Sequence, residues 1–396
     1  MFKYFTILIC ISLSTCCIAG DWELDNYSTG KLVYLHSFVN YSFDPDWQQR
    51  WEKQLMKGNG VRFSYGSASS KKLLHYEDIN INQSFGKGWG FRCYVNSQFS
   101  EYKDRSETLR FIEFQKSIFH GLSLCTAANL KYKKQDIDGK LGLLHVNKTR
   151  ENYLQLFFCW DDLVYTERND EGGRTTKNPI GISWLSRFSG EKWNIFTNGK
   201  LSTGFERDYK EKKSPDRSHL KRQTSEANGK FTWYFTEKTR IEAELNHYYF
   251  FEKQLFRQSA QDYSYSNEIF HGVLRYLVPV WTTSQLDFEM HYVNQYARAG
   301  GYKQYTYNRN EYIPAVFLKR SSEKYSVRIG YNGSFYNWDF DDYFNIKDDS
   351  KDDFVDKLNL GFTYHFSQTA HVYLSVSHVL QLDDFGGGNM RYMMFF

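Results

Sequence analysis

The stretch KLNLGFTYHF, residues 357–366, alternates apolar and polar side chains with a period of two. The apolar residues are Leu358, Leu360, Phe362, Tyr364 and Phe366, and the polar ones are Lys357, Asn359, Thr363 and His365. Because the pleat of a β-strand sends successive side chains to opposite faces, this pattern predicts a strand with one apolar and one polar face. A short break follows at 367–370, which favours a hairpin. Period two alone also fits a soluble sheet with one wet face.

The same alternation recurs at 240–246 and 286–291, and the sequence favours no helices between the strands. Two kinds of break alternate along the chain. The short breaks are 86–88, 120–121, 147–150, 189–192, 236–239, 279–282, 321–324 and 367–370. The longer, charged breaks include 169–178, 208–222, 297–310 and 339–353. This regularity is typical of a barrel with tight periplasmic turns and long extracellular loops.

Eight hairpins fit between residues 72 and 382, and single strands at 61–67 and 389–396 bring the number to eighteen. An even number places both chain ends on the periplasmic side. We therefore predict an all-β fold, a transmembrane antiparallel β-barrel of about 18 strands (16–18) that covers residues 60–396.

Composition agrees with this fold and excludes others. Aromatic residues make up 19% of the chain, and they favour strands. The mean hydropathy is −0.64, and after residue 20 no apolar run approaches the roughly 20 residues of a spanning helix. The net charge of +4 is small and well mixed, so nucleic acid is not an expected partner. Outside the first twenty residues only Cys93, Cys125 and Cys159 remain, which excludes a disulfide framework. We expect no metal site and no cofactor.

Residues 1–19 are typical of a cleaved secretory signal peptide. Lys3 gives the positive region, 4–14 the apolar stretch, and Cys17-Ile18-Ala19 the small-x-small cleavage site. An uncleaved anchor helix and a lipoprotein box at 13–16 are the alternatives.

Residues 20–59 fall outside the hairpin series. Asp44-Pro45 is typical of a helix start and Gly58 of a helix end. Between them Trp47, Trp51 and Leu55 recur every four residues, which predicts an apolar stripe on a short amphipathic helix. Two interpretations stay open: a periplasmic or interfacial helix at the barrel end, or a plug inside the lumen.

The C-terminus carries a more specific pattern. Phe396 ends the chain, and Met390, Tyr392 and Met394 share its face. This resembles the last strand of bacterial outer-membrane β-barrel proteins, a porin-like superfamily, although no single family is matched. The resemblance covers residues 60–396. It implies a cell envelope protein in the outer membrane of a Gram-negative bacterium, inserted by the barrel assembly machinery, which recognises that strand.

Charged residues on the polar faces are expected to point into the lumen, because an Arg or Lys facing lipid costs roughly 2–4 kcal/mol at mid-bilayer. These lumen-lining candidates are Arg92, Lys200, Arg240, Glu242, Glu244, Arg275, Asp287, Glu289, Arg328 and Lys357. Opposite charges either pair across neighbouring strands or set a transverse field that orients polar solutes. Their mixed signs predict no strong ion preference.

Two charged loops and one short motif are weaker candidates. The basic loop 210–222 favours either solvated charge or contact with lipopolysaccharide or an anionic glycan. The loop 339–353 holds seven Asp, which favours an acidic, flexible surface loop over a divalent-cation site, because the EF-hand pattern is lacking. His365-Phe366-Ser367 resembles the His-x-Ser arrangement of the outer-membrane phospholipase family. The predicted topology places this pair at the periplasmic rim, away from that family's site, so we expect no catalytic residues.

Two hypotheses about function follow. The first is a channel for uptake or export of polar solutes or saccharides, since eighteen strands enclose more space than their side chains fill. The second is a non-conducting structural protein, such as an adhesin, an anchor or a secretion-apparatus component. A segment that fills the lumen favours the second, and an open charged lumen favours the first.

Overall fold

The computed structural model describes residues 46, 49, 52, 53, 56, 59–69, 73–100, 107–130, 137–164, 173–177, 180–210, 217–256, 262–301, 304–342, 347–381 and 383–395. The predicted signal peptide 1–19 and the rest of the N-terminal segment lie outside them. Among the described residues, no helix is long and apolar enough to span a bilayer.

In the part of the chain that the structure describes, twenty strand segments make up a single antiparallel sheet. They are β1 (Gly60–Ser69), β2 (Leu73–Phe85), β3 (Trp89–Ser100), β4 (Glu107–Phe119), β5 (Leu122–Leu130), β6 (Ile137–Val146), β7 (Tyr153–Val164), β8 (Gly173–Lys177), β9 (Ile180–Ser189), β10 (Trp193–Ser202), β11 (Phe205–Lys210), β12 (Arg217–Tyr234), β13 (Arg240–Phe256), β14 (Tyr263–Trp281), β15 (Ser284–Gly301), β16 (Tyr305–Ser321), β17 (Tyr325–Asp342), β18 (Lys347–His365), β19 (Ala370–Val379) and β20 (Asp384–Phe395). A 3-10 turn at Gly86–Gly88 joins β2 to β3.

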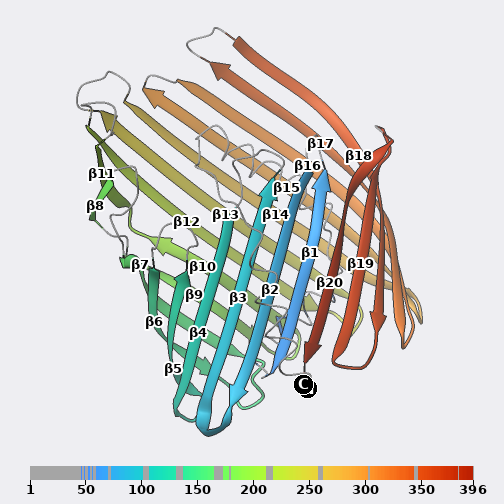
Figure 1. Cartoon of the computed structure of the whole chain (residues 1–396). Helices are drawn as coiled ribbons and strands as arrows, with labels where there is room; N and C mark the ends of the chain where they lie inside the picture. The colour runs from blue at the N-terminus through green and yellow to red at the C-terminus, as the bar shows by residue number, and fades with distance from the viewer. Residues whose placement is uncertain are drawn as a thin grey trace.

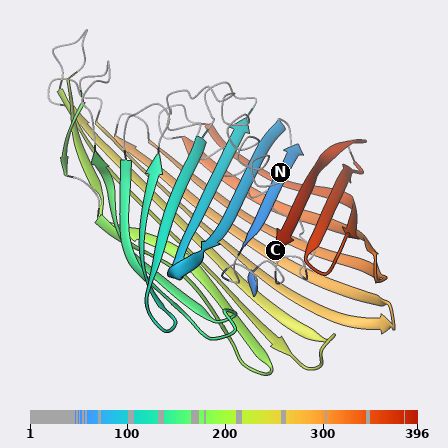
Figure 2. The same ribbon diagram turned by 60° about the horizontal axis from the view of Figure 1, so that its bottom comes forward.

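The twenty segments form eighteen barrel strands. β8 and β9 are two parts of one strand, because they pair with β11 and β10 respectively, and β10 and β11 are two parts of the next. Counting each pair once leaves eighteen, as predicted. β20 pairs with β1 from Gly60↔Phe395 to Ala68↔Gly387, which closes the barrel (Figure 1). Figure 2 shows the strands curving round into one wall.

The short turns fall where the sequence predicts them. Seven of the eight predicted breaks lie at hairpin ends, and the eighth is displaced to residues 282–283, between β14 and β15. One of these turns requires glycine: Gly121 has a φ of +79°, and a Cβ there would lie 2.5 Å from the carbonyl oxygen of Val146. In bacterial barrels the tight turns lie at the periplasmic end, so we assign the end of the barrel with these turns to the periplasm.

The long loops are shorter than predicted. β17 and β18 stay paired from Tyr325↔Tyr364 to Asp342↔Lys347, through most of the stretch 339–353 that the sequence favours as a loop. The expected loops 208–222, 297–310 and 169–178 likewise contain strand residues. Strands beyond the bilayer need no apolar face, so a charged sequence can continue the ladder. β12 to β18 have 17–19 residues each, against the roughly 9–11 that cross a membrane.

Burial is reversed relative to a soluble protein. Phe288, Met290 and Leu360 are exposed on the outer face, whereas Asp287, Glu289 and Arg328 are buried on the inner one. A closed antiparallel barrel of even strand number with an apolar exterior is the architecture of bacterial outer-membrane proteins. The chain folds as a closed antiparallel β-barrel of this kind.

Candidate functional site: the periplasmic mouth of the lumen

Seven of the ten predicted lumen candidates form one continuous chain of ion pairs on the inner wall. Arg240 on β13 donates to Glu242 at 2.8 Å, and Glu242 lies 3.8 Å from Arg275 on β14. Arg275 continues to Glu244 at 3.0 Å and to Glu289 on β15 at 3.6 Å. Arg328 on β17 ends the chain, with contacts to Glu289 at 2.6 Å and to Asp287 at 3.2 Å. Positive and negative groups alternate, so the wall charges largely neutralise one another.

The other three candidates lie apart from this chain. Arg92 on β3 pairs with Glu113 at 2.6 Å and donates to Gln155 at 3.2 Å. Lys357 on β18 is buried, and Lys200 on β10 is half-buried. That these ten residues line a pathway for solutes stays a prediction.

Sequence reasoning missed several inward polar groups. Arg309 and Glu311 on β16 pair at 2.6 Å, and His271 and His291 stack with their rings 5.5 Å apart. The sequence did indicate that His291 points inward, because it shares a strand face with Asp287 and Glu289. The candidate set contained only charged residues, which left the histidines out.

Part of the N-terminal segment lies inside the lumen. Asp46, Gln49, Glu52 and Lys53 are helical, and Met56 follows in a turn. Their spacing of three or four residues places them on one side of a helix. We call these five residues the lumen segment. The predicted apolar stripe Trp47, Trp51 and Leu55 lies outside the described residues.

Asp46 is bound by two cations of the wall. Its Oδ1 accepts from Arg240 Nη2 at 2.6 Å, and its Oδ2 accepts from Lys319 Nζ on β16 at 2.6 Å. Burial raises the pKa of the Asp46 carboxyl, but the charges of Lys319 and Arg240 lower it by more, so its pKa lies well below the usual range. The carboxylate is therefore held ionised.

Two further contacts fix the rest of the lumen segment. Glu52 is almost fully buried and accepts from Lys230 Nζ on β12 at 2.5 Å, while its backbone carbonyl accepts from the Tyr153 hydroxyl at 3.1 Å. Lys53 lies 3.6 Å from Glu151 in the turn between β6 and β7. Lys230, Glu151 and Tyr153 all lie in or near periplasmic turns. The lumen segment therefore lies across the periplasmic mouth.

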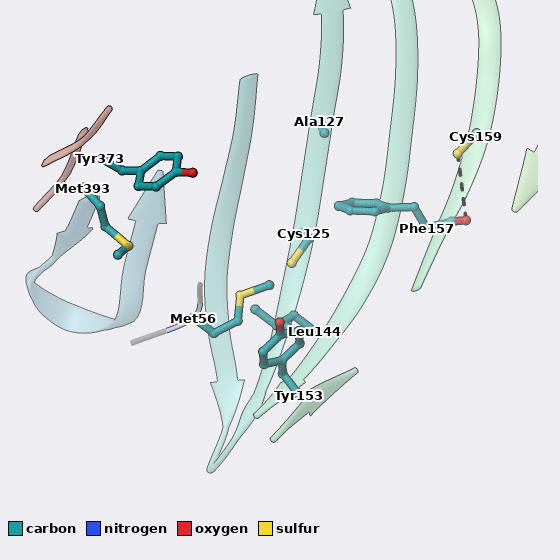
Figure 3. Packing of buried hydrophobic residues seen from close by; sticks show 9 residues of the cluster. All are labelled: Met56, Cys125, Ala127, Leu144, Tyr153, Phe157, Cys159, Tyr373 and Met393. Atoms are coloured by element: carbon teal, nitrogen blue, oxygen red, sulfur yellow. Dashed lines mark hydrogen bonds between the residues drawn. The ribbon is translucent and has the colours of Figure 1, made fainter. Parts of the chain in front are cut away.

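Met56 ends the lumen segment in an apolar cluster. Figure 3 shows its side chain among Cys125, Leu144 and Tyr153, and the same cluster extends to Met393 on β20. Cys125 and Cys159 are both fully buried as free thiols. Apolar packing at one end of the lumen segment thus complements the ion pairs at the other.

The terminal strand agrees in part with its predicted pattern. Met390 is exposed on the outer face, and the Tyr392 hydroxyl donates to Met394 Sδ at 3.0 Å, so these two share a face. Phe396 lies outside the described residues, and the role of this strand as an assembly signal stays a prediction.

In the His-x-Ser motif, His365 Nδ1 lies 2.7 Å from His371 Nδ1, and Ser367 contacts Thr369 within the turn.

No protein-family model matches this chain, and no curated protein matches it in sequence. Among solved structures it is similar to a bacterial polysaccharide outer membrane secretin, with 8% identity, a TM-score of 0.41, and coverage of 86% of this chain and 99% of that one. It is also similar to OccAB2 of Acinetobacter baumannii (8% identity, TM-score 0.35, coverage 85% and 96%) and to the copper transporter OprC (12%, 0.41, 81% and 61%).

Proposed function

We propose that this protein is an outer-membrane channel for polar solutes or saccharides, and that the lumen segment is a plug at its periplasmic mouth. The observation that supports this most directly is the anchoring of Asp46, Glu52 and Lys53 by ion pairs to strands or turns on different sides of the lumen. Although a segment in the lumen by itself favours a non-conducting barrel, anchoring largely by ion pairs fits a closure that can be released.

The size of the barrel supports a conduit. Eight strands are the number at which side chains alone fill the interior, and sixteen or more leave an aqueous channel. The lumen segment contacts the wall from β16 and β13 to the turn between β6 and β7. It can therefore obstruct part of the mouth of an eighteen-stranded barrel without being part of the wall.

The plug is held in a way that allows release. Asp46 and Glu52 contact the wall through charged groups that water and ions can also satisfy once the mouth opens. The rim pair of Lys53 and Glu151 is partly exposed, and exposed pairs contribute only about 0–1 kcal/mol. Displacement of the plug thus leaves polar groups where Asp46 and Glu52 were bound, and it uncovers the apolar cluster around Met56.

A second candidate function is a non-conducting structural protein, such as an adhesin, an anchor or a secretion-apparatus component. It is favoured by the burial of inner-wall side chains, since Asp287, Gln295 and Glu311 are all 0% exposed to solvent. Outer-membrane lipid, lipopolysaccharide and the barrel assembly machinery are proposed partners under both functions. Residues 1–19 are proposed to be a cleaved signal peptide under both.

Single-channel recording in planar bilayers tests the choice. The mature protein is compared with the double variant Asp46→Asn/Glu52→Gln, which removes the plug's two acids. The matched control is Glu191→Gln/Glu237→Gln, which removes two exposed acids of periplasmic turns. We expect a mostly closed wild type and control, and sustained opening of the plug variant. If every form inserts as a folded barrel and stays silent, the structural function is the better account.

A further inference from the structure

We propose that Arg240 and Lys319 form a binding site for the carboxylate group of an anionic solute, and that Asp46 occupies this site as an internal substitute. The inference rests on the proposed function, because the site becomes free only when the plug leaves the mouth. It adds a class of solute that the mixed charges of the sequence did not indicate.

The geometry is that of a bound carboxylate. Each oxygen of Asp46 has its own cation, Arg240 for Oδ1 and Lys319 for Oδ2, both at 2.6 Å. The two cations come from β13 and β16, with β14 and β15 between them, and the carboxylate of Asp46 bridges them. Both are buried, with side chains 5% and 7% exposed. Charge-assisted hydrogen bonds to buried cations are among the stronger polar contacts in proteins.

The Arg240 half of the site does not depend on Asp46 for its orientation. The Nε atom of Arg240 donates to Glu242 at 2.8 Å, and Glu242 lies close to Arg275 at the start of the ion-pair chain. The wall therefore holds the guanidinium while Nη2 points at the plug. A group oriented in advance loses little conformational entropy when a ligand binds.

The wall groups that bind the plug's acids are cations. Asp46 meets Arg240 and Lys319, and Glu52 meets Lys230. These three cations lie near the periplasmic turns, whereas the balanced chain of ion pairs continues along β14, β15 and β17. Departure of the plug thus presents positive groups at the mouth, and such groups raise the local concentration of anions.

Succinate, a small dicarboxylate, is the probe that tests the site, with glucose as the neutral comparison and inorganic phosphate as a non-planar anion. Calorimetry on the detergent-solubilised full mature chain needs no conduction. We expect Asp46→Asn to bind succinate at least about tenfold more tightly than wild type, because the internal competitor is gone, and adding Lys319→Gln to remove that gain. Lys238→Gln, an exposed turn lysine, is the matched control and is expected to have no effect.

Three results would overturn the proposal: no succinate binding by folded Asp46→Asn, equal binding of phosphate, or binding that persists without Lys319. Adding Lys319→Arg to Asp46→Asn is expected to restore affinity, since it keeps the charge. Asp46→Ser replaces Asp46→Asn if the latter does not fold. Failure of the proposed function is a separate result, because a plug variant that stays silent in bilayers can still bind succinate, and one that conducts can fail to bind it.

Discussion

The carboxylate of Asp46 and the guanidinium of Arg240 lie 2.6 Å apart, although 194 positions separate them in the chain. Arg240 is the first residue of β13 and the first member of the ion-pair chain that runs through Glu242 and Arg275. The lumen segment is thus joined electrostatically to the barrel wall. Changes at this contact are expected to alter the position of the plug before they alter the barrel.

The plug is expected to stay in place in mild acid. The pKa of Asp46 in the folded protein lies below the unfolded value of about 3.9. Its contribution to stability is therefore present above the unfolded pKa and is lost only as the pH falls through the lowered folded pKa. Lowering the pH from about 7 to about 5 should leave the closed fraction of single-channel recordings unchanged, with Asp46→Asn open at both values. Opening of the wild-type channel in this pH range would contradict a closure held by the ion pairs of Asp46.

Arg328→Leu is expected to lower the free energy of unfolding by about 3–5 kcal/mol, because it leaves buried acids without their cation. Arg328 contacts both Asp287 and Glu289, and its guanidinium lies 3.5 Å from the ring centre of Phe317. Denaturant unfolding in lipid vesicles measures the change. Arg320→Leu, at an exposed position on β16, is the control and should have a much smaller effect. Equal effects would show that the wall network adds little.

Met290→Lys is expected to destabilise the barrel by roughly 2–4 kcal/mol if Met290 faces the hydrocarbon core. Met290 is 47% exposed on the outer face and is paired with Leu274 and Pro314. Thr282→Lys, in an exposed turn, should change stability by less than about 0.5 kcal/mol. The same unfolding experiment compares them, and a tolerated Lys at 290 would contradict the assigned orientation of β15.

The rate at which a thiol reagent labels Cys125 measures release of the plug without electrical recording. It is fully buried in the cluster that contains Met56. In a background with Cys93→Ala and Cys159→Ala, a water-soluble maleimide should label Cys125 slowly. Labelling should become severalfold faster with Asp46→Asn/Glu52→Gln, because release of the segment uncovers the cluster. The same slow rate in both proteins would mean that the segment does not cover the thiol.

Much of the barrel could be predicted from local patterns. The period of two in KLNLGFTYHF and the alternating break lengths predict strands and their number, because each depends only on neighbouring residues. The extent of the strands was underestimated, since the charged stretch 339–353 has no apolar face to mark it. Pairing between β17 and β18 continues there because backbone groups, not side chains, form the ladder.

The site was harder to predict. Alternation identified Arg240, Glu242 and Arg275 as inward-facing, but it could not identify partners far away in the chain. Lys319 and Lys230 were missed because only their contacts with Asp46 and Glu52 distinguish them from other lysines. The plug remained one of two hypotheses, since the stripe of Trp47, Trp51 and Leu55 says nothing about the acids on the other side of the helix.

The most direct test of the account is photo-crosslinking from position 49. A photoreactive amino acid replaces Gln49, a described residue of the lumen segment, and the folded protein is irradiated in outer membranes and digested for mass spectrometry. We expect crosslinks to inward-facing residues near the periplasmic ends of the barrel strands, and fewer of them with Asp46→Asn/Glu52→Gln. Crosslinks confined to other proteins, or to residues on the outer face of the barrel, would contradict the presence of a plug in the lumen.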